Sequence, residues 1–117
     1  MTAQQKVLPA PVLKEAIEGV LYVHNLIDQA HVVIAPYPNA RPGDEVELTV
    51  ETSTGNQRRD RLLLPPEMVG QPIVFITPKK IFAEGLVPGA TAELNYRTSD
   101  DAGNVAISPV LQVHLER

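Results

Sequence analysis

Residues 91–115 read TAELNYRTSDDAGNVAISPVLQVHL, and this stretch decides the fold class. In its first part polar and apolar residues alternate, the period of two expected for a strand with one buried face. The apolar members are Ala92, Leu94 and Tyr96, and the alternation resumes at Leu111, Val113 and Leu115. Between them lies DDAGN, whose residue types tolerate positive φ or cap turns with their own side chains. The stretch therefore predicts a hairpin that closes an antiparallel all-β domain.

The composition fits one domain and narrows the classes of partner. A chain of 117 residues can bury its own core. Its net charge of −4 gives no support to a nucleic-acid partner. The absence of cysteine excludes disulfides and thiolate metal sites. No apolar run approaches the roughly 20 residues of a membrane span, and MTAQQKVLPAP does not have the pattern of a secretory signal. We therefore expect neither a membrane span nor a nucleic-acid partner.

Further strands are expected between closely spaced prolines, which suit short strands and exclude long helices. The clearest is 45–51 (EVELTVE), with others at 31–35, 58–64 and 73–77. The run at 73–77 is almost continuously apolar, which favours a strand covered on both faces. Residues 12–23 fit either a helix or two short strands around a Glu18-Gly19 turn. We favour the strands, because glycine destabilises a helix interior and the run that follows is rich in β-forming residues.

One short helix is expected after residue 77. Thr77 suits the N-cap, Pro78 the first helical position and Gly85 the left-handed position past the end. In such a helix two residues would face the core, Ile81 and Phe82, and two would face water, Lys79 and Lys80. The helix would connect two strands across the end of the domain.

About seven strands and one short connecting helix predict a two-sheet Greek-key sandwich. An up-and-down barrel is the rival, but Pro109 within the last strand favours an exposed edge or a bulge. Residues 1–11, which contain Pro9 and Pro11, are expected to be a leader or linker. Residues 12–117 are expected to be a single sandwich domain.

Several segments resemble the immunoglobulin-like repeats that occur in tandem in large bacterial surface and adhesin-type proteins. They are PAPVLKEAIEGVL at residues 9–21, ARPGDEVELTVE at 40–51, VGQPIVFITP at 69–78, and the strand of Tyr96 with DDAGN and ISPVLQVHL after it. The similarity extends from about Pro9 to Leu115. The chain differs from vertebrate immunoglobulin domains, because it lacks their two cysteines and core tryptophan.

The resemblance implies an immunoglobulin-like Greek-key sandwich without enzymatic activity, which acts as a structural or adhesive module of a larger bacterial surface protein. Its expected partners are neighbouring repeats or a protein or glycan surface. Its expected location is extracellular or at the cell surface, with a cytoplasmic location as the alternative. The strand that contains Pro109, together with the neighbouring edge, is the expected place of partner contact.

The DDAGN turn is the candidate cation site. Asp100, Asp101 and Asn104 offer the hard oxygen ligands that calcium prefers. The alternative, which we favour, is a polar turn held by local hydrogen bonds. A calcium- or carbohydrate-binding module and a small enzyme or accessory domain remain the other functional hypotheses. No catalytic residue and no cofactor are expected.

The remaining polar residues are expected to be solvated. The three histidines, His24, His31 and His114, are too dispersed for a metal motif. Glu45, Glu47 and Glu51 share one strand face and are expected to pair with Arg59 and Arg61 on the next strand. Among the tyrosines, two are expected to be exposed, Tyr22 and Tyr37, and Tyr96 is expected to lie in the core with a hydrogen bond from its hydroxyl.

Overall fold

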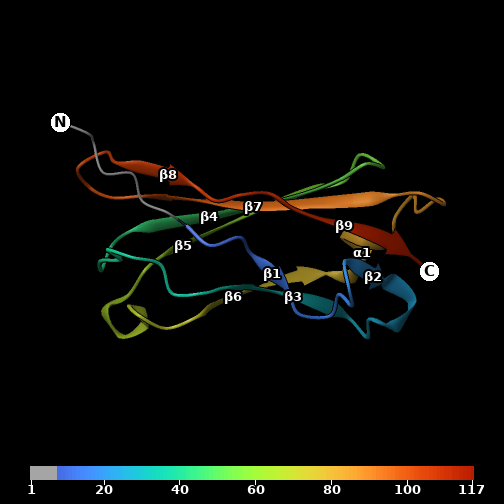
Figure 1. The fold of residues 1–117 in the computed structure, drawn as a ribbon, viewed down its shortest axis with the longest axis horizontal. Helices are drawn as coiled ribbons and strands as arrows, with labels where there is room; N and C mark the ends of the chain where they lie inside the picture. The colour runs from blue at the N-terminus through green and yellow to red at the C-terminus, as the bar shows by residue number, and fades with distance from the viewer. Residues whose placement is uncertain (1–7) are drawn as a thin grey trace.

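The computed structural model describes residues 8–117, which form a sandwich of two β-sheets (Figure 1). Sheet A has the order β1–β3–β6, with β1 at Val12–Leu13, β3 at Gln29–Ile34 and β6 at Ile73–Pro78. Sheet B has the order β2–β9–β7–β4–β5, and β8 also pairs with β7. Its strands are β2 (Val20–Tyr22), β4 (Glu45–Thr52), β5 (Gln57–Leu63), β7 (Thr91–Ser99), β8 (Val105–Ile107) and β9 (Leu111–Glu116). The helical elements are η1 (Val23–Asn25), η2 (Pro66–Met68) and α1 (Lys79–Ala83). The all-β sandwich is thus confirmed.

The distribution of strands between the sheets is that of an immunoglobulin-like sandwich. Strands β3 and β6 belong to one sheet, whereas β4, β5, β7 and β9 belong to the other, so the chain crosses between sheets more than once. Strand β2 pairs with β9 in parallel, and all other strand pairs are antiparallel within residues 8–117. Nine strands are present in this part of the chain, against an expectation of about seven, and the division of the last strand into β8 and β9 is one reason for the difference.

A tight turn divides the first strand between the two sheets. Ile17 and Val20 exchange two backbone hydrogen bonds of 2.8 and 3.0 Å. Between them Glu18 and Gly19 both have positive φ, 49° and 80°, as a type I′ turn requires. The prediction of two short strands around Glu18-Gly19 is therefore confirmed. The turn also transfers the chain from sheet A to sheet B.

The core lies between the inner faces of the two sheets. The predicted alternation is confirmed on the central strands of sheet B: Val46, Leu48 and Val50 of β4 and Ala92, Leu94 and Tyr96 of β7 are all buried. Phe82 of α1 closes one end of this core and is fully buried. Burial of each large apolar side chain stabilises the fold by roughly 1.5–3 kcal/mol before entropy is counted.

The segment that precedes β1 is packed against this core. Leu8 is buried, and the Tyr96 hydroxyl donates a 2.7 Å hydrogen bond to the Pro9 carbonyl. Burial raises the pKa of Tyr96 to about 12, so this hydroxyl keeps its proton at neutral pH. Residues 8–11 of the expected leader thus belong to the packed body, and residues 1–7 lie outside the described residues.

A β-bulge separates β8 from β9, as the position of Pro109 predicts. On β7, Arg97 pairs with Ile107 and Leu94 pairs with Leu111, so two residues of β7 face three residues of the last strand. Ser108 joins the two strands at this point. Its N–H donates to the Tyr96 carbonyl at 2.8 Å, and its hydroxyl accepts from the Tyr96 N–H at 2.9 Å. The hydroxyl replaces the carbonyl that a regular ladder would supply.

Strand β6 differs from its prediction. Ile73, Phe75 and Thr77 are buried, but Val74 and Ile76 are 51% and 47% exposed. The expectation of a strand covered on both faces is wrong, because β6 lies at the edge of sheet A and nothing in residues 8–117 covers its outer side.

The short helix is present but starts later than predicted. Its N-cap is Pro78, and Thr77 remains in β6 with its side chain buried, so Thr77 is not the cap. The expectation that Lys79 faces water is also wrong, because its ammonium donates to the Leu26 carbonyl at 2.8 Å. Gly85 follows the helix with φ 69°, as expected.

The bulge gives a direct test of how Ser108 contributes to the fold. Ser108→Ala should lower the free energy of unfolding by about 1–3 kcal/mol, because it leaves the buried Tyr96 N–H without its acceptor. Denaturant unfolding followed by circular dichroism measures this change. Ser99→Ala, at the end of the same β7 strand, is the control and should change stability by less than about 0.5 kcal/mol. Equal effects in the two variants would show that the hydroxyl is not required.

Candidate functional site

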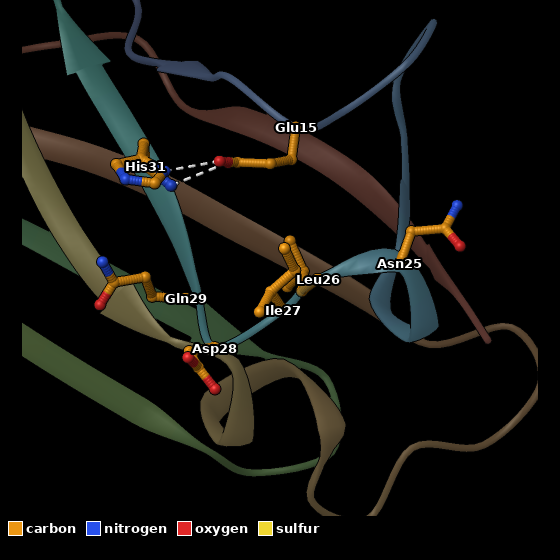
Figure 2. A pocket seen from close by; sticks show the side chains of 7 residues that line it. All are labelled: Glu15, Asn25, Leu26, Ile27, Asp28, Gln29 and His31. Atoms are coloured by element: carbon orange, nitrogen blue, oxygen red, sulfur yellow. Dashed lines mark hydrogen bonds and ion pairs between the residues drawn. The ribbon is translucent and has the colours of Figure 1, made fainter.

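A pocket of about 400 Å³ lies beside β3 at one end of sheet A (Figure 2). This volume falls within the roughly 300–1,000 Å³ of small-molecule sites. Its described lining combines polar and apolar surface and consists of Glu15, Asn25, Leu26, Ile27, Asp28, Gln29 and His31. The lining comes from three segments: the turn after β1, the last residue of η1 with the loop after it, and β3 itself.

The loop after η1 is held in place from both sides. Leu26 is buried in the core, and its carbonyl accepts from the Lys79 ammonium. The backbone N–H of Lys79 also donates to the Asp28 carbonyl at 3.0 Å. Ile27, between these two anchors, is 89% exposed. Contacts with α1 therefore fix this wall of the pocket, even though the side chain of Ile27 at its centre faces solvent.

A carboxylate–imidazole pair forms the opposite wall. The Lys14 N–H donates to the His31 carbonyl at 2.9 Å, which continues the pairing of β1 with β3. The next residue, Glu15, then reaches back to β3. Its Oε1 accepts from the His31 N–H at 2.8 Å, and its Oε2 lies 2.6 Å from His31 Nδ1. Figure 2 shows both contacts.

The contacts with His31 determine the acidity of Glu15. Partial burial by itself raises the pKa of this carboxyl, but the hydrogen bonds from the His31 backbone and ring outweigh it. The net effect lowers the pKa of Glu15 below its ordinary value of 4.5. His31 is therefore a half-buried partner of Glu15, and the expectation that it is a solvated surface histidine is wrong.

This arrangement can hydrogen-bond a polar ligand. The described lining contains no hydroxyl or thiol for His31 to activate. His24 and His114 lie elsewhere and are exposed, as expected. Within residues 8–117, no group of three or more His, Cys, Asp or Glu side chains is placed to hold a metal ion. No helix in this part of the chain has the length and apolar character needed to cross a bilayer.

The DDAGN turn uses its acidic side chain to close itself. Asp100 Oδ1 accepts from the N–H groups of Ala102 and Asn104 at 3.0 and 2.8 Å. Asp100 Oδ2 accepts from the Asn104 side-chain amide at 3.0 Å. Asp101 is exposed at the tip of the turn. These are the local hydrogen bonds of a polar turn, and they engage two of the three residues named as calcium ligands.

The outer face of sheet B is charged, in agreement with the predicted ladder. Arg61 Nη2 donates to Glu45 Oε2 at 2.5 Å, and Arg97, on β7, lies 3.9 Å from Glu47. The expected pairing of Arg59 with a glutamate is not present in the register, which places Thr49 opposite it. The glutamates therefore belong to a cross-strand charge network.

The burial of the three tyrosines differs in one case from the expectation. Tyr22 is exposed and Tyr96 is buried, as predicted, but Tyr37 is also buried. Its hydroxyl donates to Asp44 Oδ2 at 3.0 Å, and the same oxygen accepts from the Arg41 N–H. Burial and this hydrogen bond raise the pKa of Tyr37. Tyr37 therefore fixes the loop before β4 and is not a surface for stacking.

Comparison of the chain with protein-family models, with curated proteins and with solved structures finds no match. What the molecule does must therefore be inferred from its own residues.

The Glu15–His31 pair predicts a defined loss of stability in acid. A carboxyl whose pKa is lowered on folding contributes stability above its unfolded pKa, and that stability is lost as the pH falls through the folded pKa. Glu15→Gln should therefore cost about 1 kcal/mol at neutral pH, and this cost should shrink progressively below the ordinary value of 4.5. Urea unfolding between neutral pH and acid measures the difference. Glu116→Gln at the exposed chain end is the control, and a pH-independent cost in Glu15→Gln would contradict the assignment.

The turn is tested by removing its carboxylate. Asp100→Ala should lower the free energy of unfolding by about 1–2 kcal/mol, because three hydrogen bonds are lost. Asp101→Ala should have little effect. Because the Asp100 carboxylate is already engaged, calcium at about 1 mM, the range of extracellular modules, should leave Tm unchanged. A saturable rise in Tm in the native chain but not in Asp100→Ala would instead support the calcium site.

Proposed function

We propose that this chain is a non-enzymatic, immunoglobulin-like structural module of a larger bacterial surface protein, and that it holds neighbouring parts at a fixed distance and direction. The observation that carries this proposal is the placement of the ends of the described chain. The body measures 47 × 31 × 23 Å. Strand β9 runs to one end of its long axis, and residues 8–11 lie away from that end, beside β1 (Figure 1). A module with this geometry transmits position from one neighbour to the next.

The entering segment has a fixed direction. The 2.7 Å hydrogen bond from Tyr96 to Pro9 joins it to the central strand β7. Leu8, just before it, is buried in the core. The described chain therefore enters the sandwich through a packed segment.

The leaving strand is held in a way that resists tension. Strand β9 lies between β7 and β2, and β2 and β9 are parallel, with Val20 opposite His114 and Tyr22 opposite Glu116. The His114 N–H donates to the Gly19 carbonyl at 2.9 Å. Tension between the two chain ends pulls β2 and β9 in opposite directions along their lengths. The backbone bonds between them are then loaded together and not one after another.

The resemblance of several sequence segments to bacterial surface repeats is the reason for proposing a place in a longer surface protein, and the geometry above supports a mechanical role there. Neighbouring modules or a protein or glycan surface are the proposed partners. The resemblance and the geometry both concern the sandwich as a whole, and neither argument requires a catalytic group.

Single-molecule pulling tests this function, and the absence of cysteine allows defined attachment points. A chain with Ala10→Cys and Arg117→Cys is pulled along its long axis, so β2 and β9 are sheared. A chain with Asn25→Cys and Arg117→Cys is pulled from the same end of both strands, so their hydrogen bonds open one at a time. The first geometry should require a force several times higher. Equal forces in the two geometries would contradict a mechanical role.

A further inference from the structure

We propose that the edge of β6 binds the β6 edge of a second copy of this chain, antiparallel, so that the two A sheets join into one. This contact lies on a different sheet from the β2–β9 pair that would carry tension. Either proposal can therefore fail without the other.

The first observation is that β6 lacks the protection that the other edges have. Natural sheets discourage edge pairing with short strands, charged side chains or proline. Strand β1 has two residues, and β2 and β8 have three each. Strand β5 is longer but contains Arg58, Arg59, Asp60 and Arg61. Strand β6 has six residues, IVFITP, with no charge and with proline only at its last position.

The second observation is that the free side of β6 is not paired in the part of the chain that the structure describes. Strand β6 ends the order of sheet A, and its partner in residues 8–117 is β3. The backbone hydrogen bonds of loops and turns in this part of the chain do not include residues 73–78 either. The outward N–H and C=O groups of β6 are therefore available to a further strand.

The third observation is a groove along this edge. It has a volume of about 330 Å³ and is lined by Asp60, Arg61 and Leu62 of β5, Met68 of η2, and Val74, Phe75 and Ile76 of β6. Each charged residue in this lining already has an oppositely charged neighbour. Asp60 lies 3.0 Å from Arg58, and Arg61 lies 2.5 Å from Glu45. An incoming charged side chain would therefore find no unpaired charge in this lining to bind. An uncharged strand, in contrast, would cover the apolar side chains of Leu62 and Met68.

A second copy supplies a strand of the required chemistry. If two β6 strands pair antiparallel about Phe75, Val74 of each copy lies opposite Ile76 of the other. Ile73 of each copy lies opposite Thr77 of the other. These pairs of β-branched residues are favourable across a sheet and bring no like charges together. The outer row of sheet A, in which Val12, Val33 and Val74 are in register, would then continue into the second copy.

The size of the contact sets the expected affinity. Two six-residue strands meet over about 20 Å, which places the contact at or below the roughly 1,200 Å² low end of stable complexes. We therefore expect a weak dimer that forms at high concentration or when two copies are held close together.

Analytical ultracentrifugation from about 10 µM to about 1 mM tests the proposal, a range suited to weak interfaces. The native chain should shift from monomer to dimer. Ile76→Lys should weaken dimerisation at least about tenfold, because it places a lysine from each copy into an apolar cross-strand pair. The control is Ile107→Lys on β8, which is 64% exposed and should dimerise like the native chain. Circular dichroism verifies that both variants are folded.

Amide hydrogen exchange identifies the strand that mediates contact. Raising the protein concentration should slow exchange in residues 73–78 and leave β5 and β8 unchanged. A chain that stays monomeric up to about 1 mM, a dimer unaffected by Ile76→Lys, or protection at β8 in place of β6 would each overturn the proposal. A monomer that binds a synthetic uncharged strand at β6 would also overturn it, because the occupant would then be a different chain.

Discussion

Tyr96 connects three parts of the chain that are far apart in the sequence. Its backbone N–H and C=O both bind Ser108 across the bulge of the last strand. Its ring fills the core, and its hydroxyl binds Pro9 before the first strand. The interruption of the last strand is therefore compatible with a fully buried central strand, since the Ser108 hydroxyl accepts the bond that the bulge would leave unmade. The direction in which the chain enters depends on the same residue.

The two sheets meet solvent in different ways. The outer face of sheet B is a network of glutamates and arginines, among them Glu45 and Arg61, and its long edge strand β5 is charged. The outer face of sheet A instead aligns Val12, Val33 and Val74 across all three strands. Sheet A is the smaller sheet, but its outer face is the more apolar of the two. Contact with another molecule would therefore bury more apolar surface on sheet A than on sheet B.

Local patterns predict the strands well, but they do not predict which strands are neighbours. The alternation in β4 and β7, the Glu18-Gly19 turn and the bulge at Pro109 follow from residue types within a few positions of one another. Glu15 and His31 are 16 residues apart in the sequence, and they meet only because β1 lies beside β3. The sequence does not predict the exposure of β6 for the same reason, because an outward-facing isoleucine at an edge has the same sequence signature as a buried one.

The proposed tension path and the proposed dimer edge are geometrically compatible. The strands run mainly along the long axis of the body, and β9 leaves at one end of it, away from the segment that precedes β1 (Figure 1). The β6 edge therefore runs along the side of the molecule, and pairing there leaves both ends accessible to neighbouring modules. If copies lie in tandem on two adjacent chains, a contact too weak to persist between free monomers becomes favourable through repetition along the chains. Lateral association would then depend on the surface density of the parent protein.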